Sequence, residues 1–262
     1  MVSKTLQDFD IGQIANSGQC FRMSEISPAI WTFKALGRVL HITKMSTNKY
    51  IFDCSEEEYE NLWYNYFDLD TNYSIYKEVI RHSQDPYLIK AIDFGYGIRI
   101  LHQDLWETMV SFIISQRNNI KRIKGIIERL CYPFNGVFPS PSLLEDYSED
   151  DFKVLGLGYR AKYIVNLVKA VLNGELDLDY LKTLPTQDAL KCLQKFSGIG
   201  EKVANCIALF SLHKIDAFPI DVWIKRIIDT HYNGEFPVER YAPFVGIVQQ
   251  YMFFYERSLH IS

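Results

Sequence analysis

The sequence predicts an α+β protein, in which an N-terminal antiparallel β-sheet domain precedes a mostly α-helical region. Runs typical of β-strands lie before residue 54, and helical spacing of apolar residues begins at residue 55. Because strands precede helices instead of alternating with them, an α+β arrangement is favoured over a parallel α/β sheet. With 48% apolar residues, the 262-residue chain can bury a substantial core.

Three units are expected along the chain. Residues 1–101 are predicted to form the β domain with its connecting helices, and residues 102–215 a helical domain. Residues 216–262 are predicted to form a C-terminal helical segment that completes a cleft.

The predicted strands come first. The runs Trp31–Gly37 and Arg38–Thr43 are rich in β-branched and aromatic residues, partly alternate in polarity, and have Gly37 at a turn between them. Tyr50–Asp53 is a further strand candidate. We therefore expect short antiparallel strands over residues 1 to about 53.

The helices follow from Ser55 onwards. Ser55 with Glu58, and Asp104 with Glu107, have the spacing of capping pairs, and apolar residues at helical spacing follow both. Further helices are predicted over three segments: Tyr147–Leu155, Ala161–Leu172 and Phe244–Phe254.

Charge and cysteine content exclude some classes of protein. A balance of 28 Lys and Arg against 32 Asp and Glu gives a net charge of −4, which does not support a strongly basic nucleic-acid binder. A local basic strip is present instead, at Arg117, Lys121, Arg122 and Lys124. Five scattered cysteines with no Cys-x-x-Cys pair predict no disulfide framework, no iron–sulfur cluster and no zinc site. No long apolar run is present, so we expect a soluble intracellular protein without membrane contact.

The segment Phe196–Cys206 has the pattern of a helix-hairpin-helix. Apolar residues at helical spacing lie on both sides of Gly198-Ile199-Gly200. Two glycines let a backbone approach a phosphate closely, and the first amides of the second helix, including that of Val203, can bind it. We therefore predict that Gly198, Gly200 and Val203 contact a DNA backbone.

Lys202 and Asp221 form a candidate catalytic pair. Lys202 lies in the first turn of the second hairpin helix, where the helix dipole and burial both disfavour an ammonium and favour a nucleophilic amine. Asp221 follows Pro219 and precedes apolar helical spacing, as a helix-capping carboxylate would. An amine and a carboxylate together suit attack at a sugar carbon on which positive charge develops.

Several motifs in order resemble one enzyme family. Besides the hairpin, they are Gly18–Arg22, Gly97–Arg99 with Gln103-Asp104, Ser111–Ile113, Asn118–Ile120 with Glu128–Cys131, and Leu155–Tyr163. Together they span most of the chain and resemble the 8-oxoguanine DNA glycosylase/AP lyases of the helix-hairpin-helix (HhH-GPD) superfamily.

The resemblance implies a bifunctional DNA repair enzyme. Lys202 would attack C1′ of the damaged nucleotide and form a Schiff base, Asp221 would stabilise the cationic transition state, and β-elimination would cut the strand. No organic cofactor is implied, although the hairpin carbonyls could hold an alkali or alkaline-earth ion. The implied partner is double-stranded DNA containing 8-oxoguanine opposite cytosine. The expected form is a monomer in the cytoplasm or nucleoid, or in the nucleus of a eukaryote.

The resemblance also assigns roles to other residues. The base pocket would use Gly18, whose carbonyl accepts from the N7 hydrogen of the oxidised base, with Cys206, Gln249 and Phe253. Further DNA contacts would come from Arg117, Asn118 and Asn119 at the gap left by the flipped base, from Tyr159 as a wedge, and from Arg122 and Arg160 at the opposite cytosine. Arg117 and Trp223 depart from the family pattern, which has Asn and, in animal relatives, His at these positions.

Other interpretations stay open from the sequence alone. Gly18 also fits a turn, Cys206 and Phe253 fit a buried core, and the arginines fit phosphate contacts. A glycosylase for alkylated or other purines that uses Asp221 alone is one rival function. A non-catalytic DNA-binding hairpin protein is another.

Overall fold

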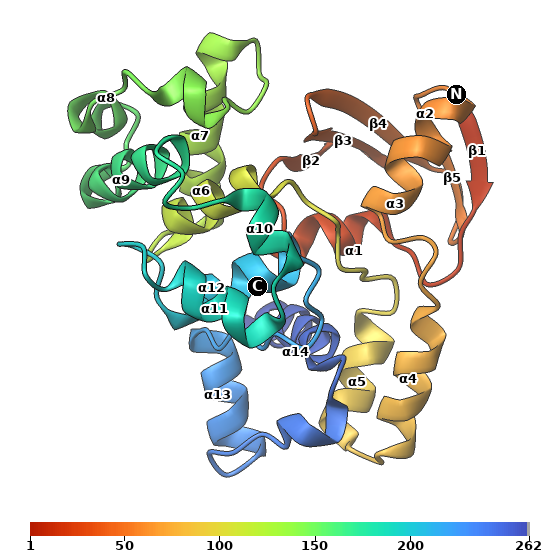
Figure 1. The fold of residues 1–262 in the computed structure, drawn as a ribbon. Helices are drawn as coiled ribbons and strands as arrows, with labels where there is room; N and C mark the ends of the chain where they lie inside the picture. Colours follow the sequence, from red (N-terminus) through yellow and green to blue (C-terminus); the bar gives the residue numbers. More distant parts are fainter. Residues whose placement is uncertain (261–262) are drawn as a thin grey trace.

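The computed structural model describes residues 1–260 and has a sheet domain followed by a helical region (Figure 1). The sheet contains β1 (Val2–Thr5), β2 (Met23–Ser27), β3 (Ile30–Ala35), β4 (Arg38–Lys44) and β5 (Lys49–Phe52). All pairs are antiparallel, in the order β1-β5-β4-β3-β2. The predicted α+β class is confirmed, and the three predicted strands correspond to β3, β4 and β5.

The sheet packs on an aromatic core. Helix α1 (Ile11–Asn16) and the continuous helical segment α2 (Glu56–Glu58), η1 (Tyr59–Trp63, a π-helical turn) and α3 (Tyr64–Tyr66) lie beside it. The Phe33 ring lies 5.0 Å from that of Tyr66 and 5.7 Å from that of Trp63. Ser55 caps the segment by accepting from the Glu58 amide, as predicted, while the Glu58 carboxylate accepts from Trp63 Nε1.

The helical region follows the predicted order. Its longer helices are α4 (Tyr73–His82), α5 (Pro86–Phe94), α6 (Leu105–Ser115), α7 (Ile120–Cys131), α8 (Glu149–Val154), α9 (Ala161–Leu172), α10 (Leu178–Thr183), α11 (Thr186–Leu193), α12 (Glu201–Phe210), α13 (Val222–His231) and α14 (Val245–His260). Short 3-10 turns are η2 (Tyr132–Phe134), η3 (Pro141–Leu144), η4 (Gly158–Arg160) and η5 (Val238–Tyr241). The predicted helix at 161–172 is α9, and those at 147–155 and 244–254 correspond to α8 and α14.

Helices far apart in the chain share one core. Helix α5 packs against α14, and α4 packs against α5, so part of the first predicted unit packs with the last (Figure 1). The boundaries at residues 101 and 215 stay predictions. Among residues 1–260, no helix combines the length and the apolarity that crossing a bilayer requires.

The N-terminal segment 17–22 lies between two apolar cores. Cys20 belongs to the core under the sheet, whereas Phe21 belongs to the larger helical core. Gln19 fixes the segment, since its Nε2 donates to Arg99 O at 2.8 Å and its Oε1 accepts from Leu101 N at 2.9 Å. Gln103 Nε2 in turn donates to Gln19 O at 2.8 Å. The backbone around Gly18 is therefore fixed to the crossover 95–104.

Candidate active site

A cleft of about 950 Å³ lies between the hairpin, the start of α13, α14 and the segment that contains Gly18. Twelve of the predicted site residues line it: Gly18, Arg117, Asn118, Asn119, Gly200, Lys202, Val203, Cys206, Asp221, Trp223, Gln249 and Phe253. The lining does not include four others: Gly198, Arg122, Tyr159 and Arg160. Residues separated by more than 200 positions in the sequence thus line one space.

The hairpin connects α11 to α12 as predicted. Gly198 has φ +90°, and its carbonyl accepts from Gln116 Nε2 at 2.8 Å. Gly200 is the N-cap of α12, and no heavy atom lies within 4 Å of the position that a Cβ would take there. The N-terminus of α12 is therefore open to an approaching anion, with amides unhindered by side chains.

Lys202 and Cys206 lie one helical turn apart on the cleft face of α12. The half-buried Lys202 has its Nζ 5.4 Å from the ring centroid of Phe112 on α6. Cys206 is buried, and burial raises the pKa of its thiol, an effect that the positive charge of Lys202 opposes. Cys206 thus presents a neutral, polarizable sulfur beside the amine and also belongs to the helical core.

Asp221 is the N-cap of α13. One carboxylate oxygen, Oδ1, accepts from the amides of Trp223 at 3.0 Å and Ile224 at 2.9 Å. Burial raises the pKa of this carboxyl, against the effect of those amides and of Lys202. In the described chain no ion pair within 4 Å joins Lys202 to Asp221, although both line the cleft. A sugar can therefore lie between an amine and a partly desolvated carboxylate.

The predicted base-binding residues surround the same space. Gly18 has φ +78°, and a Cβ there would stand 2.9 Å from Cε1 of Phe253. Phe253 is only partly buried, so its ring is not confined to the core. Gln249 is buried, and its Nε2 donates to Pro219 O at 3.1 Å, just before Asp221 in the chain. This hydrogen bond gives the buried amide of Gln249 a partner.

The predicted Arg117–Asn119 turn is shaped by local bonds. Arg117 has φ +46°, a left-handed conformation in which Asn is far commoner than Arg. Asn118 Nδ2 donates to Ile114 O, and Asn119 caps α7 by accepting from the Arg122 amide. The exposed Arg117 side chain therefore occupies a position where the backbone itself favours the family's Asn.

Backbone carbonyls hold Arg160 in this structure, and its contact with the opposite base stays a prediction. Its guanidinium is buried and donates to the carbonyls of Gln116, Leu157 and Arg117. In this conformation it holds the turn after α6 and is not available to an opposite base. Tyr159 is 52% exposed and lies over that guanidinium at 4.5 Å, as suits a wedge. Arg122 is exposed and makes one long contact, 3.3 Å to Gly156 O.

A positive charge lies next to Trp223 although the side chain itself has none. The Arg226 guanidinium lies 5.2 Å from the Trp223 ring centroid, and Lys225 lines the cleft. A phosphate beside Trp223 would therefore meet cations that are its neighbours in sequence.

Several lining residues were not predicted from the sequence. They are Phe21, Phe112, Ser115, Gln116, Ile120, Ile123, Glu201, Phe210, Pro219, Ile220, Val222, Lys225, Gln250 and Arg257. Phe112 and Phe210 stack at 5.5 Å between centroids, and Arg257 Nη1 donates to Asn16 O, two residues before Gly18. Apolar residues of this kind look like ordinary core in a sequence. Arg257 could have been found from the sequence, because a charged residue four positions after Phe253 lies on the same face of α14.

Comparisons with known proteins agree with this geometry. Residues 1–109 match the model of the 8-oxoguanine DNA glycosylase N-terminal domain, and residues 110–236 match that of HhH-GPD superfamily base excision DNA repair proteins. The chain is similar to the crystal structure of Clostridium acetobutylicum 8-oxoguanine glycosylase/lyase bound to double-stranded DNA with cytosine opposite 8-oxoguanine. The TM-score is 0.91 and the identity 36%, over 97% of this chain and 94% of that one.

Curated relatives carry matching names. A probable N-glycosylase/DNA lyase of Methanothermobacter thermautotrophicus is 31% identical over 66% of this chain and 68% of its own length. The N-glycosylase/DNA lyase of Saccharomyces cerevisiae is 35% identical over 52% of this chain, and the match spans 42% of the yeast protein. On these matches and on its fold, the chain belongs to the 8-oxoguanine DNA glycosylase/lyase family of the HhH-GPD superfamily.

Proposed function

We propose that this chain removes 8-oxoguanine from duplex DNA and cuts the strand at the resulting abasic site, acting as a monomer without an organic cofactor. The observation that carries the proposal is the single cleft that Gly18, Lys202, Cys206, Asp221 and Phe253 line together. It combines a nucleophile, a carboxylate and a base-sized apolar wall, all of which a base-flipping glycosylase needs.

Lys202 supplies the nucleophile. Its Nζ attacks C1′ of the extruded nucleotide, the N-glycosidic bond breaks, and the base leaves with the bonding electron pair. Asp221 offsets the positive charge that develops on the sugar, and its partly desolvated site strengthens that interaction. The nitrogen then loses a proton and the C1′–O4′ bond of the sugar opens, with O4′ taking up a proton, so that Lys202 is joined to C1′ as a Schiff base that water later hydrolyses. Loss of a C2′ proton expels the 3′ phosphate.

The base is selected beside Gly18. Guanine has a lone pair on N7, whereas 8-oxoguanine has a hydrogen there, so a backbone carbonyl favours the lesion. Phe253, packed against Gly18, offers a stacking face, and Cys206 offers a neutral sulfur surface. A preference for cytosine in the opposite strand belongs to the same proposal and now rests on Arg122 more than on Arg160.

One experiment tests the chemistry directly. A duplex with 8-oxoguanine opposite cytosine is incubated with the protein, with and without borohydride, which traps a Schiff base covalently. Lys202→Gln should lose trapping and strand cutting, whereas Lys225→Gln, which changes another lysine of the same cleft, should keep both. Trapping lost only in Lys225→Gln would assign the nucleophile to Lys225.

The rival functions give different results in the same assay. An alkylated-base glycosylase would release a methylated purine without borohydride trapping, and the place of Lys202 in the cleft argues against it. A non-catalytic hairpin protein would bind duplex DNA and release no base. The partly desolvated Asp221 argues against that role, because a carboxylate in the cleft repels DNA phosphates, and a neutral Asn would cap α13 equally well.

A further inference from the structure

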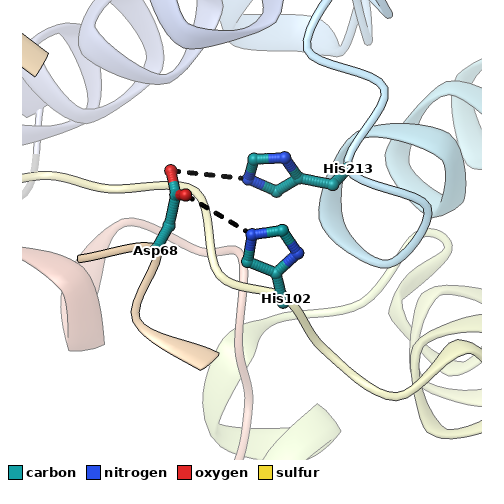
Figure 2. A group of neighbouring side chains, drawn as sticks. All are labelled: Asp68, His102 and His213. Atoms are coloured by element: carbon teal, nitrogen blue, oxygen red, sulfur yellow. Dashed lines mark hydrogen bonds and ion pairs between the residues drawn. The ribbon is translucent and has the colours of Figure 1, made fainter. Parts of the chain in front are cut away.

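Three side chains that the cleft does not use come together outside it: Asp68, His102 and His213 (Figure 2). Asp68 follows α3, His102 lies in the crossover before α6, and His213 lies in the loop after α12. One potential ligand atom from each lies within 4.8 Å of the other two. Both imidazole rings point a nitrogen at the Asp68 carboxylate, one at each oxygen (Figure 2).

The spacing of these atoms is too long for good ion pairs. Nε2 of His102 lies 3.4 Å from Oδ1 of Asp68, and Nε2 of His213 lies 3.6 Å from Oδ2. A charged N–H···O hydrogen bond measures about 2.7–2.9 Å. Two ligand atoms that each lie about 2.1 Å from a tetrahedral zinc ion are about 3.4 Å apart. These two nitrogen–oxygen distances, the shorter of which is a long hydrogen bond, match the separation of neighbouring ligands around an ion.

His213 has an unmet requirement. Its Nε2 is buried and has no hydrogen-bond partner in the described part of the chain. Leaving a buried polar atom without a partner costs about 1–3 kcal/mol. Coordination to an ion at the centre of the group would satisfy this nitrogen.

The carboxylate is already held in place from behind. Thr71 Oγ1 donates to Oδ1 of Asp68 at 2.7 Å, and the Tyr73 hydroxyl donates to Oδ2 at 2.8 Å. Asp68 is only 6% exposed, so these bonds fix its orientation. Outer hydrogen bonds of this kind orient the ligands of metal sites.

We propose that Asp68, His102 and His213 bind one divalent transition-metal ion of the Zn²⁺ type, with water completing its coordination. Two imidazoles and a carboxylate are a donor set that such ions favour. The rings now stack with centroids 3.7 Å apart and planes at 16°, so binding requires them to turn until both Nε2 atoms face the ion. Both side chains lie in loops and are 29% and 22% exposed, so the turn stays local.

The ion would connect three separate parts of the fold. It would join the end of α3 to the crossover and to the loop after α12, where Gln103 N already donates to Phe210 O at 3.3 Å. Helix α12 contains Lys202 in its first turn and ends just before the loop of His213. The ion would therefore hold this hairpin helix against the N-terminal domain. Its role is therefore structural, and it takes no part in base release.

Metal titration tests this proposal on the full chain. After treatment with a chelator, the protein is titrated with Zn²⁺ in a calorimeter and, separately, with Co²⁺, whose visible absorption reports coordination by nitrogen and oxygen. The wild type should bind one ion. Both His102→Gln and His213→Gln should bind at least tenfold more weakly. His41→Gln is the matched control, because His41 also faces a carboxylate, that of Asp53 at 3.9 Å, without a third ligand.

Thermal unfolding gives a second measurement that does not depend on glycosylase activity. Zn²⁺ should raise the melting temperature of the wild type and of His41→Gln, but not that of the two ligand variants. Absence of binding to the wild type at millimolar Zn²⁺, or equal affinity in the ligand variants, would overturn the proposal. If His213→Gln does not fold by circular dichroism, the more exposed His102→Gln decides the outcome.

Discussion

Gly198 packs so closely on Tyr163 that an added Cβ would stand 2.5 Å from Cγ of the ring. With φ at +90°, Gly198 also has a backbone conformation that L side chains avoid. Gly200, two residues on, has neither constraint. The fold thus requires Gly198, whereas Gly200 leaves space for a ligand at the N-terminus of α12.

The same substitution at both glycines separates these roles. Gly198→Ser should destabilise the protein by about 1–3 kcal/mol, because it overpacks Tyr163 and strains the backbone. Gly200→Ser should keep stability, since serine is a good N-cap, and should weaken DNA binding by crowding the phosphate. Urea unfolding and fluorescence anisotropy with duplex DNA measure the two effects. Normal DNA affinity in Gly200→Ser would place the phosphate elsewhere.

Asp221→Asn removes the charge and keeps the helix cap. Asn and Asp are comparable N-caps, so the bonds to Trp223 N and Ile224 N should persist and stability should be unchanged or higher. Single-turnover base release should fall by at least a hundredfold, because a neutral amide cannot offset the cationic sugar. Asp221→Ala, which loses the cap as well, should cost about 1 kcal/mol of stability. Normal release by Asp221→Asn would remove the carboxylate from the mechanism.

The two arginines near the α6–α7 turn should behave differently. Arg160→Ala should destabilise the protein by about 2 kcal/mol or more, because three carbonyls lose a buried charged donor. Arg122→Ala should leave stability within about 0.5 kcal/mol and reduce the preference for cytosine, which carries two neighbouring acceptors. Single-turnover rates opposite each of the four bases provide the measurement. An unchanged preference in Arg122→Ala would show that Arg122 does not read the opposite base.

Glu107 should make stability depend on pH. Burial raises the pKa of this carboxyl to about 7, although Arg22 at 3.0 Å opposes the shift. The unfolded chain therefore loses this proton near pH 4.5, while the folded protein keeps it until about pH 7. The contribution of Glu107 to the free energy of unfolding is therefore fully present below pH 4.5. Between pH 4.5 and 7 it falls by at most about 1.4 kcal/mol per pH unit.

Glu107→Gln tests this dependence. The neutral amide mimics the protonated carboxyl, so the unfolding free energy of the variant should vary less between pH 5 and 7 than that of the wild type. The exposed Glu57→Gln serves as control and should follow the wild type. Urea unfolding at pH 5, 6 and 7 is sufficient. Parallel curves for wild type and Glu107→Gln would contradict the assignment.

The sequence predicted those elements whose signal is local. Strand β3 alternates in burial along its whole length, and Asp104 caps α6 as its position suggested. Edge strand β2 was missed because, apart from Met23, its side chains are exposed and its register shifts between Glu25 and Ser27. An edge strand of this kind lacks the apolar alternation on which such predictions depend.

In the candidate site, too, the residues with a local signal in the sequence were the ones that could be predicted. Lys202, Cys206 and Asp221 were predictable because helical spacing and capping place them, and the family motifs added Gly18 and Phe253. The burial of Arg160 was not predictable, since nothing in a sequence shows whether a guanidinium faces solvent or carbonyls. Asp68, His102 and His213 were invisible for another reason, because ligands so far apart in the chain have no spacing to recognise.

The segment that contains Gly18 lies on the boundary between two cores, with Cys20 in one and Phe21 in the other. A shift of one core relative to the other would therefore be felt in this segment. The wall of the cleft beside Phe253 should therefore respond to such motion before the hairpin does, because Lys202 and Cys206 belong to a helix within a single core. Discrimination between damaged and normal bases is then the more fragile property. On the proposed function, mutations distant from the cleft are expected to relax base selectivity before they affect the proposed chemistry at Lys202.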